Sequence, residues 1–366
     1  MRILLIGEYS NVHATLAKGL RTLGHEVTVV SNGDFWKNYP RDIDVARPEG
    51  RLGGVRLLLK VWSLLPRLRG YDVVQLINPM FLELKAERLF PIYRYLRRHN
   101  NHMVLCAMGM DYYWVSECTF NKPLRYSDFN FGPNLRTDEP AVREQRDWLG
   151  TPKEQLNRMI AGDCDGIAAG LYEDYVCYTP HFNQKTRFIP LPIDLPSASA
   201  PSFEAPQKVR IFIGISKNRS QYKGTDIMLR AAEDVIRKHP DSAILMKAEG
   251  VPFGEYKKMM DGADVILDQL YSYTPSMNPL LAMSKGIICV GGGEPENYEI
   301  LGEHELRPII NVEPNYDSVF QQLEQLVLHP ERIPELKRQS IEYVKRHHDH
   351  LKVARQYETF YLSMGK

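Results

Sequence analysis

Short apolar runs alternate with helical patterns along the whole chain. The first run, Arg2–Gly7, is rich in leucine and isoleucine and leads into a polar turn. A helical pattern then places Leu16, Leu20 and Leu23 on one face and closes at a glycine, before a second apolar run at Val27–Val30. This order of strand, turn, helix and strand predicts the start of a parallel α/β sheet.

The alternation continues in two series. The remaining strand-like runs of the first series are Val73–Ile77, Met103–Ala107, Gly166–Ala169 and Phe188–Leu191. Those of the second series are Val209–Ile213, Ala243–Met246, Ala263–Leu267, Ile287–Val290 and Pro308–Val312. Between the two series, Pro190 to Pro206 holds five prolines among small residues, which is typical of a linker. We therefore predict an α/β fold with two Rossmann-like parallel-sheet domains, 1–195 and 196–345, facing a cleft that is the default ligand site.

Composition excludes several classes of protein. Of the 366 residues, 43% are hydrophobic and 25% charged, which is typical of a folded globular protein and not of a disordered or fibrous one. No apolar run approaches the ~18 residues of a membrane-spanning helix, and the first run does not read as a signal peptide. The five cysteines are widely spaced, which predicts reduced thiols and a cytoplasmic location.

The net charge of +1 hides an asymmetry. Residues 1–110 carry 16 Lys and Arg against 9 Asp and Glu, a net of +7, so the remainder carries −6. An acidic rear half disfavours nucleic-acid binding. Much of the basic charge lies where Arg51, Arg56, Lys60, Arg67 and Arg69 surround leucines and Trp62. Two interpretations stay open: an ordinary helix covering the sheet, or a helix making peripheral contact with the inner face of a membrane.

The turn after the first strand is a candidate binding loop. It lacks the G-x-G-x-x-G spacing, so a dinucleotide cofactor is not expected. It directs Glu8, Tyr9, Asn11 and His13 towards the predicted cleft, although Asn11 could equally serve only as a helix cap.

Three loops of the second domain carry candidate chemistry. After the strand at Val209–Ile213, one loop holds Lys217, Arg219 and Lys223, cations that suit a diphosphate, although a solvated basic loop is equally compatible. The second loop, after Ala263–Leu267, is expected to start a helix whose free amides attract an anion. The third follows Ile287–Val290 and contains three glycines that would allow close approach of a ligand. The polar candidates on the last two loops are Asp268, Ser276, Asn278, Glu294 and Glu296.

The motifs together resemble GT-B glycosyltransferases, most closely glycosyltransferase family 4, over nearly the whole chain. The segments that carry the resemblance are Lys223-Gly224, Ala282-Met283-Ser284-Lys285-Gly286, Gly-Gly-Gly-Glu-Pro-Glu at 291–296, Tyr71-Asp72-Val73-Val74 and Ile189-Pro190-Leu191-Pro192-Ile193-Asp194. The resemblance implies two Rossmann-like domains, with a C-terminal helix at 346–366 packing back on the first. It further implies a nucleoside diphosphate sugar, UDP- or GDP-linked, held by the second domain, and a glycan or lipid-linked acceptor held by the first, at Glu8, Tyr9, Asn11 and His13.

The resemblance also implies catalytic roles. Arg219 and Lys223 match the diphosphate-binding cations of the family, so the reaction would need no metal and no further cofactor. Gly109-Met110-Asp111 resembles a segment that faces the donor sugar, which makes Asp111 a candidate acceptor of a sugar hydroxyl, with a helix cap as the alternative. Transfer with retention of configuration, in polysaccharide or glycolipid synthesis, is what the family would imply.

One departure from the family pattern is large. Two glutamates eight residues apart are expected, and the alignment puts Tyr273 and Leu281 in their places. Asp268, Glu294 and Glu296 are the candidate replacements. Two alternatives therefore stay open: a catalytically degenerate scaffold or binding subunit, and a nucleotide-sugar epimerase of the same fold. Near the C-terminus, His347 and His348 are expected on a solvated charged face and not in a zinc site.

Overall fold

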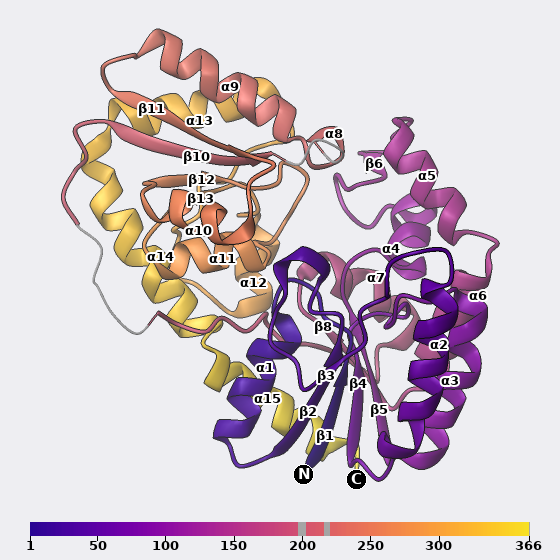
Figure 1. Ribbon diagram of the computed structural model, residues 1–366. Helices are drawn as coiled ribbons and strands as arrows, with labels where there is room; N and C mark the ends of the chain where they lie inside the picture. Colours follow the sequence, from indigo (N-terminus) through magenta and orange to yellow (C-terminus); the bar gives the residue numbers. More distant parts are fainter. Residues whose placement is uncertain (197–202, 216–219, 366) are drawn as a thin grey trace. The chain divides into compact units, whose positions relative to one another are not determined.

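The computed structural model describes residues 1–196, 203–215 and 220–365. These residues form two compact units (Figure 1). Unit 1 consists of Met1–Pro123, Val142–Pro192 and His350–Lys366, and unit 2 of Leu124–Ala141 and Ile193–Asp349. The segment Leu124–Ala141 thus belongs to unit 2, which the predicted boundary near residue 195 does not anticipate.

Unit 1 is built on a seven-stranded parallel sheet with the order β3-β2-β1-β4-β5-β8-β9. Its strands are β1 (Arg2–Ile6), β2 (Glu26–Ser31), β3 (Ile43–Asp44), β4 (Val73–Leu76), β5 (His102–Ala107), β8 (Gly166–Ala169) and β9 (Thr186–Phe188). Four consecutive residues of β1 are buried, because helices cover both faces of a parallel sheet and the strands then have no polar side.

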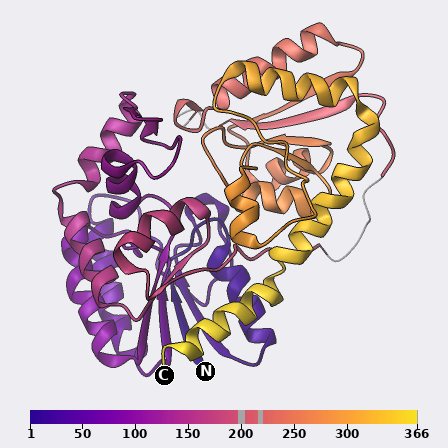
Figure 2. The same cartoon turned by 180° about the vertical axis from the view of Figure 1, so that it is seen from behind.

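Helices cover this sheet. They are α1 (Val12–Thr22), α2 (Gly53–Leu64), α3 (Ala86–His99), α4 (Tyr112–Ser116), α5 (Glu139–Trp148, which starts in unit 2), α6 (Pro152–Asp163), α7 (Tyr172–Phe182) and α15 (His350–Ser363). The last helix packs against α1, in agreement with the expected return of the C-terminal helix. His25, between α1 and β2, has its Nε2 2.9 Å from Glu358 Oε1 of α15. Figure 2 shows α15 along unit 1, with the two chain ends side by side.

Unit 2 contains a four-stranded parallel sheet with the order β11-β10-β12-β13. The strands are β10 (Val209–Ile215), β11 (Ala243–Glu249), β12 (Val265–Leu267) and β13 (Ile288–Val290). The helices are α8 (Ser220–Lys223), α9 (Thr225–Lys238), α10 (Phe253–Asp261), α11 (Met277–Ser284), α12 (Pro295–Leu301), α13 (Tyr316–Leu328) and α14 (Ile333–His347). The two parallel sheets confirm the predicted fold class. The strand predicted at Pro308–Val312 is wrong in part, since Ile310 forms only an isolated bridge with Val290.

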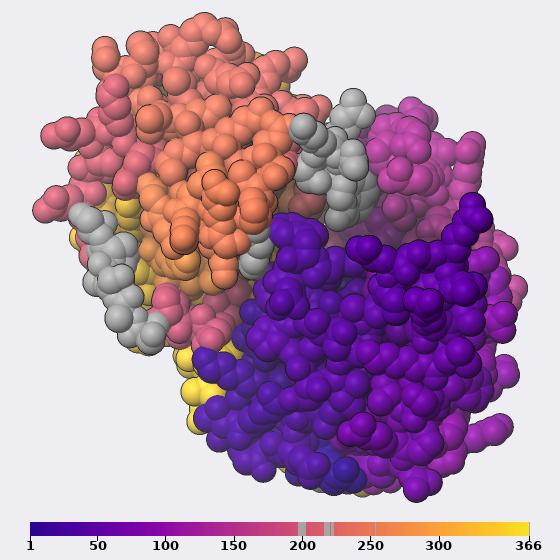
Figure 3. All heavy atoms as spheres, in the orientation of Figure 1, coloured from indigo at the N-terminus to yellow at the C-terminus, as the bar shows by residue number. Residues whose placement is uncertain are grey.

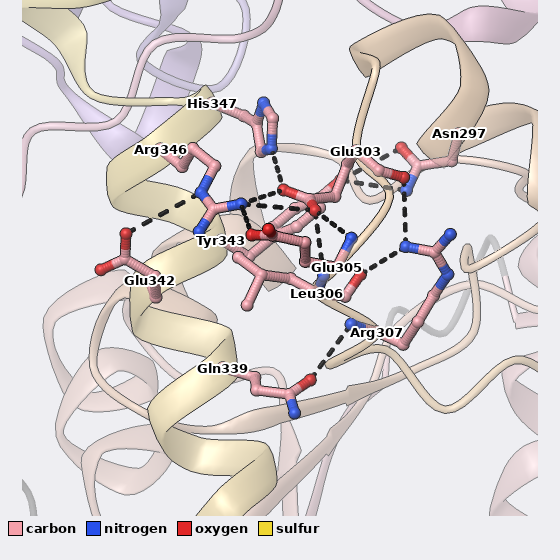
Figure 4. Close-up of polar contacts among 10 residues, drawn as sticks. All are labelled: Asn297, Glu303, Glu305, Leu306, Arg307, Gln339, Glu342, Tyr343, Arg346 and His347. Atoms are coloured by element: carbon pink, nitrogen blue, oxygen red, sulfur yellow. Dashed lines mark hydrogen bonds and ion pairs between the residues drawn. The ribbon is translucent and has the colours of Figure 1, made fainter.

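The end of α14 is fixed by a buried carboxylate (Figure 4). Glu303 is 2% exposed and accepts hydrogen bonds from His347 Nε2 at 2.6 Å and Arg346 Nη1 at 3.2 Å. Burial raises the pKa of Glu303, but the hydrogen bond from His347 and those from two backbone amides outweigh it and hold the pKa at about 2. The solvated face predicted for His347 and His348 is therefore wrong: His347 pairs with Glu303, and His348 is 4% exposed.

The segment Leu124–Ala141, here called the inserted segment, contains a small antiparallel pair, β6 (Asn130–Phe131) with β7 (Asn134–Leu135). It leaves unit 1 after Pro123 and returns to it at Val142. The chain therefore passes from one unit to the other here as well as at Pro192 and at Asp349.

Among the described helices, none is both long and apolar enough to cross a bilayer.

Candidate functional site

The carboxyl edge of the unit 2 sheet is where its polar candidates gather. The chain runs from β10 outward to β11 and then crosses back to β12 on the other side of β10. At such a change of direction the loops that follow adjacent strands separate and leave room for a ligand. Lys223 follows β10, while Asp268 and Ser276 follow β12.

Asp268 lies at the centre of this edge. Burial raises the pKa of its carboxyl group. The positive charge of Lys223 and side-chain hydrogen bonds with Asn278, Gln269 and Ser276 oppose that rise. Four residues singled out in the sequence, Lys223, Asp268, Ser276 and Asn278, are therefore brought together. We call them the Asp268 cluster.

The backbone around the Asp268 cluster is held by neighbouring elements. The Leu270 amide donates to the Lys223 carbonyl oxygen at 2.9 Å, which ties the loop after β10 to the loop after β12. The Asn278 side chain donates to Tyr256 Oη at 2.9 Å. Ser276 precedes α11, but its side chain does not cap the helix. The first turn of α11 therefore starts beside Asp268 without a side-chain cap. Lys217 and Arg219, predicted for the same site, lie outside the described residues.

Two of the three glycines after β13, for which the sequence predicts close approach of a ligand, pack against a neighbouring loop. Gly291 has φ +102, and a Cβ atom there would lie 2.7 Å from the Gln269 carbonyl oxygen. Gly292 has φ +70, and its Cβ would lie 3.1 Å from backbone atoms of Thr274. The glycines thus allow the loop after β13 to pack on the loop after β12, so close backbone contact within unit 2 accounts for them without a ligand.

Tyr273, at the position of one expected glutamate, is 1% exposed and packs against the inserted segment. The Arg125 amide donates to Tyr273 Oη at 2.7 Å, and the Arg125 guanidinium lies 5.0 Å from the centre of the Tyr273 ring. Tyr126 packs on the same ring, at 4.8 Å between ring centres. Arg136, also of the inserted segment, lies 4.3 Å from the ring centre of Tyr271. Tyr273 therefore anchors the inserted segment to the loop that carries Asp268.

The two glutamates after the glycines are bound to the same segment. Glu294 is 7% exposed and accepts hydrogen bonds from Arg125 Nη2 at 2.6 Å and Tyr126 Oη at 2.5 Å. Glu296 accepts from both terminal nitrogens of Arg125. Burial alone would raise the pKa of Glu296, but the hydrogen bond from Arg125 outweighs it and holds the pKa below its usual value. Both predicted donor-binding glutamates are therefore engaged by Arg125, a residue that the sequence patterns did not single out.

We expect replacement of Arg125 by alanine to lower the unfolding free energy of unit 2 by about 1–2 kcal/mol. The change leaves the buried Glu294 without its cation, and the loss is moderated because the Arg125 side chain is half exposed. In a double-mutant cycle with Glu294→Gln, the double variant should lose less unfolding free energy than the two single variants lose together, because each single variant already breaks the same pair. Hydrogen exchange of the loop 291–296 measures the loss of stability in each variant. Arg88→Ala, an exposed cation of unit 1, is the control, and equal protection in both variants would contradict the assignment.

Unit 1 has a pocket of about 330 Å³ at the carboxyl ends of β1 and β4, where its own strand order changes direction. Its lining includes Glu8, Tyr9, Asn78 and Trp148. Burial raises the pKa of Glu8 to about 8, although its carboxylate accepts hydrogen bonds from the first amides of α1. A carboxyl group that holds its proton near neutral pH can donate a hydrogen bond to a ligand oxygen.

The other two candidates of this turn do not line the pocket. His13 is fully buried, and its Nδ1 donates to the Gly7 carbonyl oxygen at 2.8 Å while its Nε2 accepts from Gln75 at 3.2 Å. Burial lowers the pKa of His13 to about 4, so the ring is neutral. Gln75 in turn accepts from Tyr361 Oη at 2.7 Å, which links α15 to the sheet. Asn11 sits at the start of α1 in a left-handed conformation, with φ 75.

Asp111 acts as a helix cap. It is 1% exposed, and its two oxygens accept from the Trp114 amide at 2.9 Å and from Tyr178 Oη at 2.6 Å. Burial raises the pKa of Asp111 to about 6, against the effect of these hydrogen bonds. The sequence leaves two roles open for Asp111, a helix cap and a contact to a sugar hydroxyl. The structure favours the helix cap.

Comparisons with known proteins place this fold. No family model matches the chain, and no curated protein does. Its structure is similar to sucrose-phosphate synthase from Thermosynechococcus elongatus, with a TM-score of 0.64 and 13% identity over 100% of this chain and 99% of that one. It is also similar to HepE of Anabaena in complex with UDP and glucose, with a TM-score of 0.58 and 13% identity over 98% of each chain.

A third similar structure carries another activity. It is a candidate UDP-N-acetylglucosamine 2-epimerase from Listeria monocytogenes, with a TM-score of 0.55 and 8% identity over 97% of this chain and 94% of that one. The fold of this chain is GT-B. At such identities the likeness concerns the fold alone.

Proposed function

We propose that the chain transfers a sugar from a nucleoside diphosphate sugar to a hydroxyl group of a glycan or lipid-linked acceptor. The observation that carries the proposal is the Asp268 cluster, which gathers a cation, a carboxylate, a hydroxyl and an amide where the unit 2 sheet changes direction. A diphosphate needs the cation and uncapped amides, while ribose or sugar hydroxyls need the carboxylate and the amide.

The chemistry assigned to these groups is stabilisation of the leaving diphosphate. As the glycosidic bond to phosphate breaks, negative charge grows on the diphosphate oxygens, and Lys223 with the first amides of α11 would stabilise it. Lys217 and Arg219 would add to this charge, on the family resemblance alone. We further propose that no metal ion is required and that the anomeric configuration is retained.

A UDP-sugar is the first donor to test. HepE, of the same fold over the full chain, is described in complex with UDP and glucose. On the acceptor side, Glu8, Tyr9 and Asn78 of the unit 1 pocket offer polar groups to a hydroxyl-bearing molecule. Of the predicted acceptor-side residues we retain Glu8 and Tyr9, while the fully buried His13 fits a structural role.

One observation favours a second candidate. Tyr273 and Leu281 lie where the family has glutamates, and the hydroxyl of Tyr273 accepts a hydrogen bond from the backbone of the inserted segment. This favours a binding protein without turnover. The epimerase-like neighbour supports a third reading, in which the donor sugar is altered without an acceptor.

A ligand and turnover panel separates the three. UDP-, GDP-, ADP- and CMP-sugars are screened by thermal shift, since a ligand that binds only the folded protein raises its stability by mass action. Release of the nucleoside diphosphate and the identity of the sugar are then followed with and without added acceptors. A transferase shows a shift and acceptor-dependent release; an epimerase changes the sugar without acceptor; a binding protein shows the shift only. Absence of a shift with every donor contradicts the proposal.

A further inference from the structure

The outer face of α2 is apolar and exposed. Val55, Leu59 and Trp62 are 54%, 65% and 48% exposed, and Leu52, just before the helix, is 61% exposed. At about 100° per residue, the three helical positions fall within an arc of about 60°. They form one exposed stripe along the helix. Figure 3 shows the indigo-to-purple residues of this part of the chain at the surface of unit 1.

The folding of unit 1 does not account for this stripe. The opposite face of α2 supplies Leu57 and Val61, which are 0% and 2% exposed and belong to the core. A helix that covers a sheet needs one apolar face and presents a polar face to water. A second apolar face on the solvent side indicates contact with something else.

The charged side chains of the stretch 51–70, which contains the stripe, have a single sign. Residues 51–70 contain no carboxylate. Within the part of the chain that the structure describes, the cations of this stretch form no ion pair. They are Arg51, Arg56, Lys60, Arg67 and Arg69. Two of them, Arg56 and Lys60, lie on α2 itself, beside the stripe.

The stripe is joined to the unit 1 pocket by a short stretch of chain. Val45 lines the pocket, and the backbone amide of Arg47 donates to Glu83 Oε2 at 3.1 Å, a second pocket residue. The stripe begins at Leu52, five residues beyond Arg47. The start of the stripe therefore lies seven residues along the chain from Val45 of the pocket, within the same unit.

We propose that the outer face of α2 lies on an anionic lipid bilayer and that the unit 1 pocket receives an acceptor held in that bilayer. Apolar side chains and Trp62 would enter the interface, while the flanking cations meet lipid phosphates. The alternative occupant, a second copy of this chain on the same face, would bring five cations against five others. The claim that the unit 1 pocket receives a lipid-held acceptor rests on the proposed transferase function, whereas the bilayer contact does not.

Vesicle co-sedimentation tests the contact. The full chain is mixed with vesicles of phosphatidylcholine alone or with phosphatidylglycerol added. We expect binding to the anionic vesicles that weakens with added salt. The double variant Leu59→Ser/Trp62→Ser should bind at least about 10-fold more weakly, and Arg56→Gln/Lys60→Gln about 10-fold more weakly as well. Leu328→Ser, at a 49% exposed leucine of α13 in unit 2, is the matched control and should bind like the wild type.

Failure of the bilayer contact and failure of the proposed transferase function give different results in these experiments. Failure of the wild type to bind anionic vesicles, or unchanged binding by Leu59→Ser/Trp62→Ser, overturns the inference. A wild-type dimer that this variant dissociates, without vesicle binding, also overturns it. The donor panel run on the same samples is the separate readout: vesicle binding without a thermal shift from any UDP-, GDP-, ADP- or CMP-sugar removes the transferase proposal and leaves the bilayer contact standing. If both bind, acceptor turnover should rise when a lipid-linked sugar is presented in anionic vesicles.

Discussion

Replacing Lys223 with alanine is expected to weaken the binding of a UDP-sugar about 10- to 100-fold. A charge-assisted contact to phosphate accounts for about 1.5–3 kcal/mol, which converts to this range. The positive charge of Lys223 also acts on the carboxyl group of Asp268. Without it, the negative charge of Asp268 would lie beside the diphosphate with no neighbouring cation from Lys223. The two effects act in the same direction, so Lys223→Ala should be the most damaging single change to donor binding among the described residues of this cluster.

The measurement is titration calorimetry with the donor found by the ligand panel. Lys223→Arg keeps the charge and should retain most of the affinity. Lys208→Ala is the matched control, because Lys208 is exposed and lies before β10, at the opposite edge of the same sheet. An affinity for the donor that Lys223→Ala leaves unchanged would show that the diphosphate binds elsewhere.

Replacing Lys337 with methionine should cost unit 2 about 3 kcal/mol of unfolding free energy. Lys337 is 5% exposed, and its Nζ lies 2.6 Å from Oδ1 of Asp264, which is fully buried. Arg210 Nε donates to the other carboxylate oxygen at 2.9 Å. Burial alone would raise the pKa of Asp264, but its hydrogen bonds with Arg210 and Lys337 outweigh this and hold it below the usual value. Removing Lys337 leaves the buried carboxylate with one cation, Arg210, in place of two, and breaks the more buried of its two ion pairs.

The matched control is Lys238→Met. Lys238 forms a pair of similar length, 2.7 Å to Glu324 Oε1, but is 58% exposed, so its loss should cost at most about 1 kcal/mol. The tryptophans at positions 36, 62, 114 and 148 all lie in unit 1, so their fluorescence does not follow unit 2. Hydrogen exchange of β10 and β12 is therefore the measurement. Similar losses in the two variants would show that burial does not decide the strength of the Asp264 pair.

The fold could be predicted from the sequence because buried parallel strands are apolar throughout. Runs such as Met103–Ala107 have no polar side, and helical patterns between them require crossover connections. The residues of the Asp268 cluster lie together for a related reason, since polar residues that follow neighbouring parallel strands meet at one edge of the sheet.

The inserted segment could not be predicted in this way. Its contacts join Arg125 to Glu294 across 169 residues of sequence, and no periodicity in residues 124–141 indicates them. The hydroxyl contacts predicted for Glu294 and Glu296 rest on the position of their loop alone, and no pattern in the sequence indicates their partner Arg125. Asp111 and His13 show a related limit, because a polar residue after a strand can turn into the protein as easily as towards a ligand.

The proposed function requires that a nucleoside diphosphate sugar binds at the carboxyl edge of the unit 2 sheet. A crystal structure of the chain with bound UDP tests it most directly. We expect the diphosphate within hydrogen-bonding distance of Lys223 Nζ and the first amides of α11, with Asp268 or Asn278 facing hydroxyl groups of the ligand. UDP bound instead in the unit 1 pocket beside Glu8 and Tyr9, or at the amino edge of the unit 2 sheet, would contradict it.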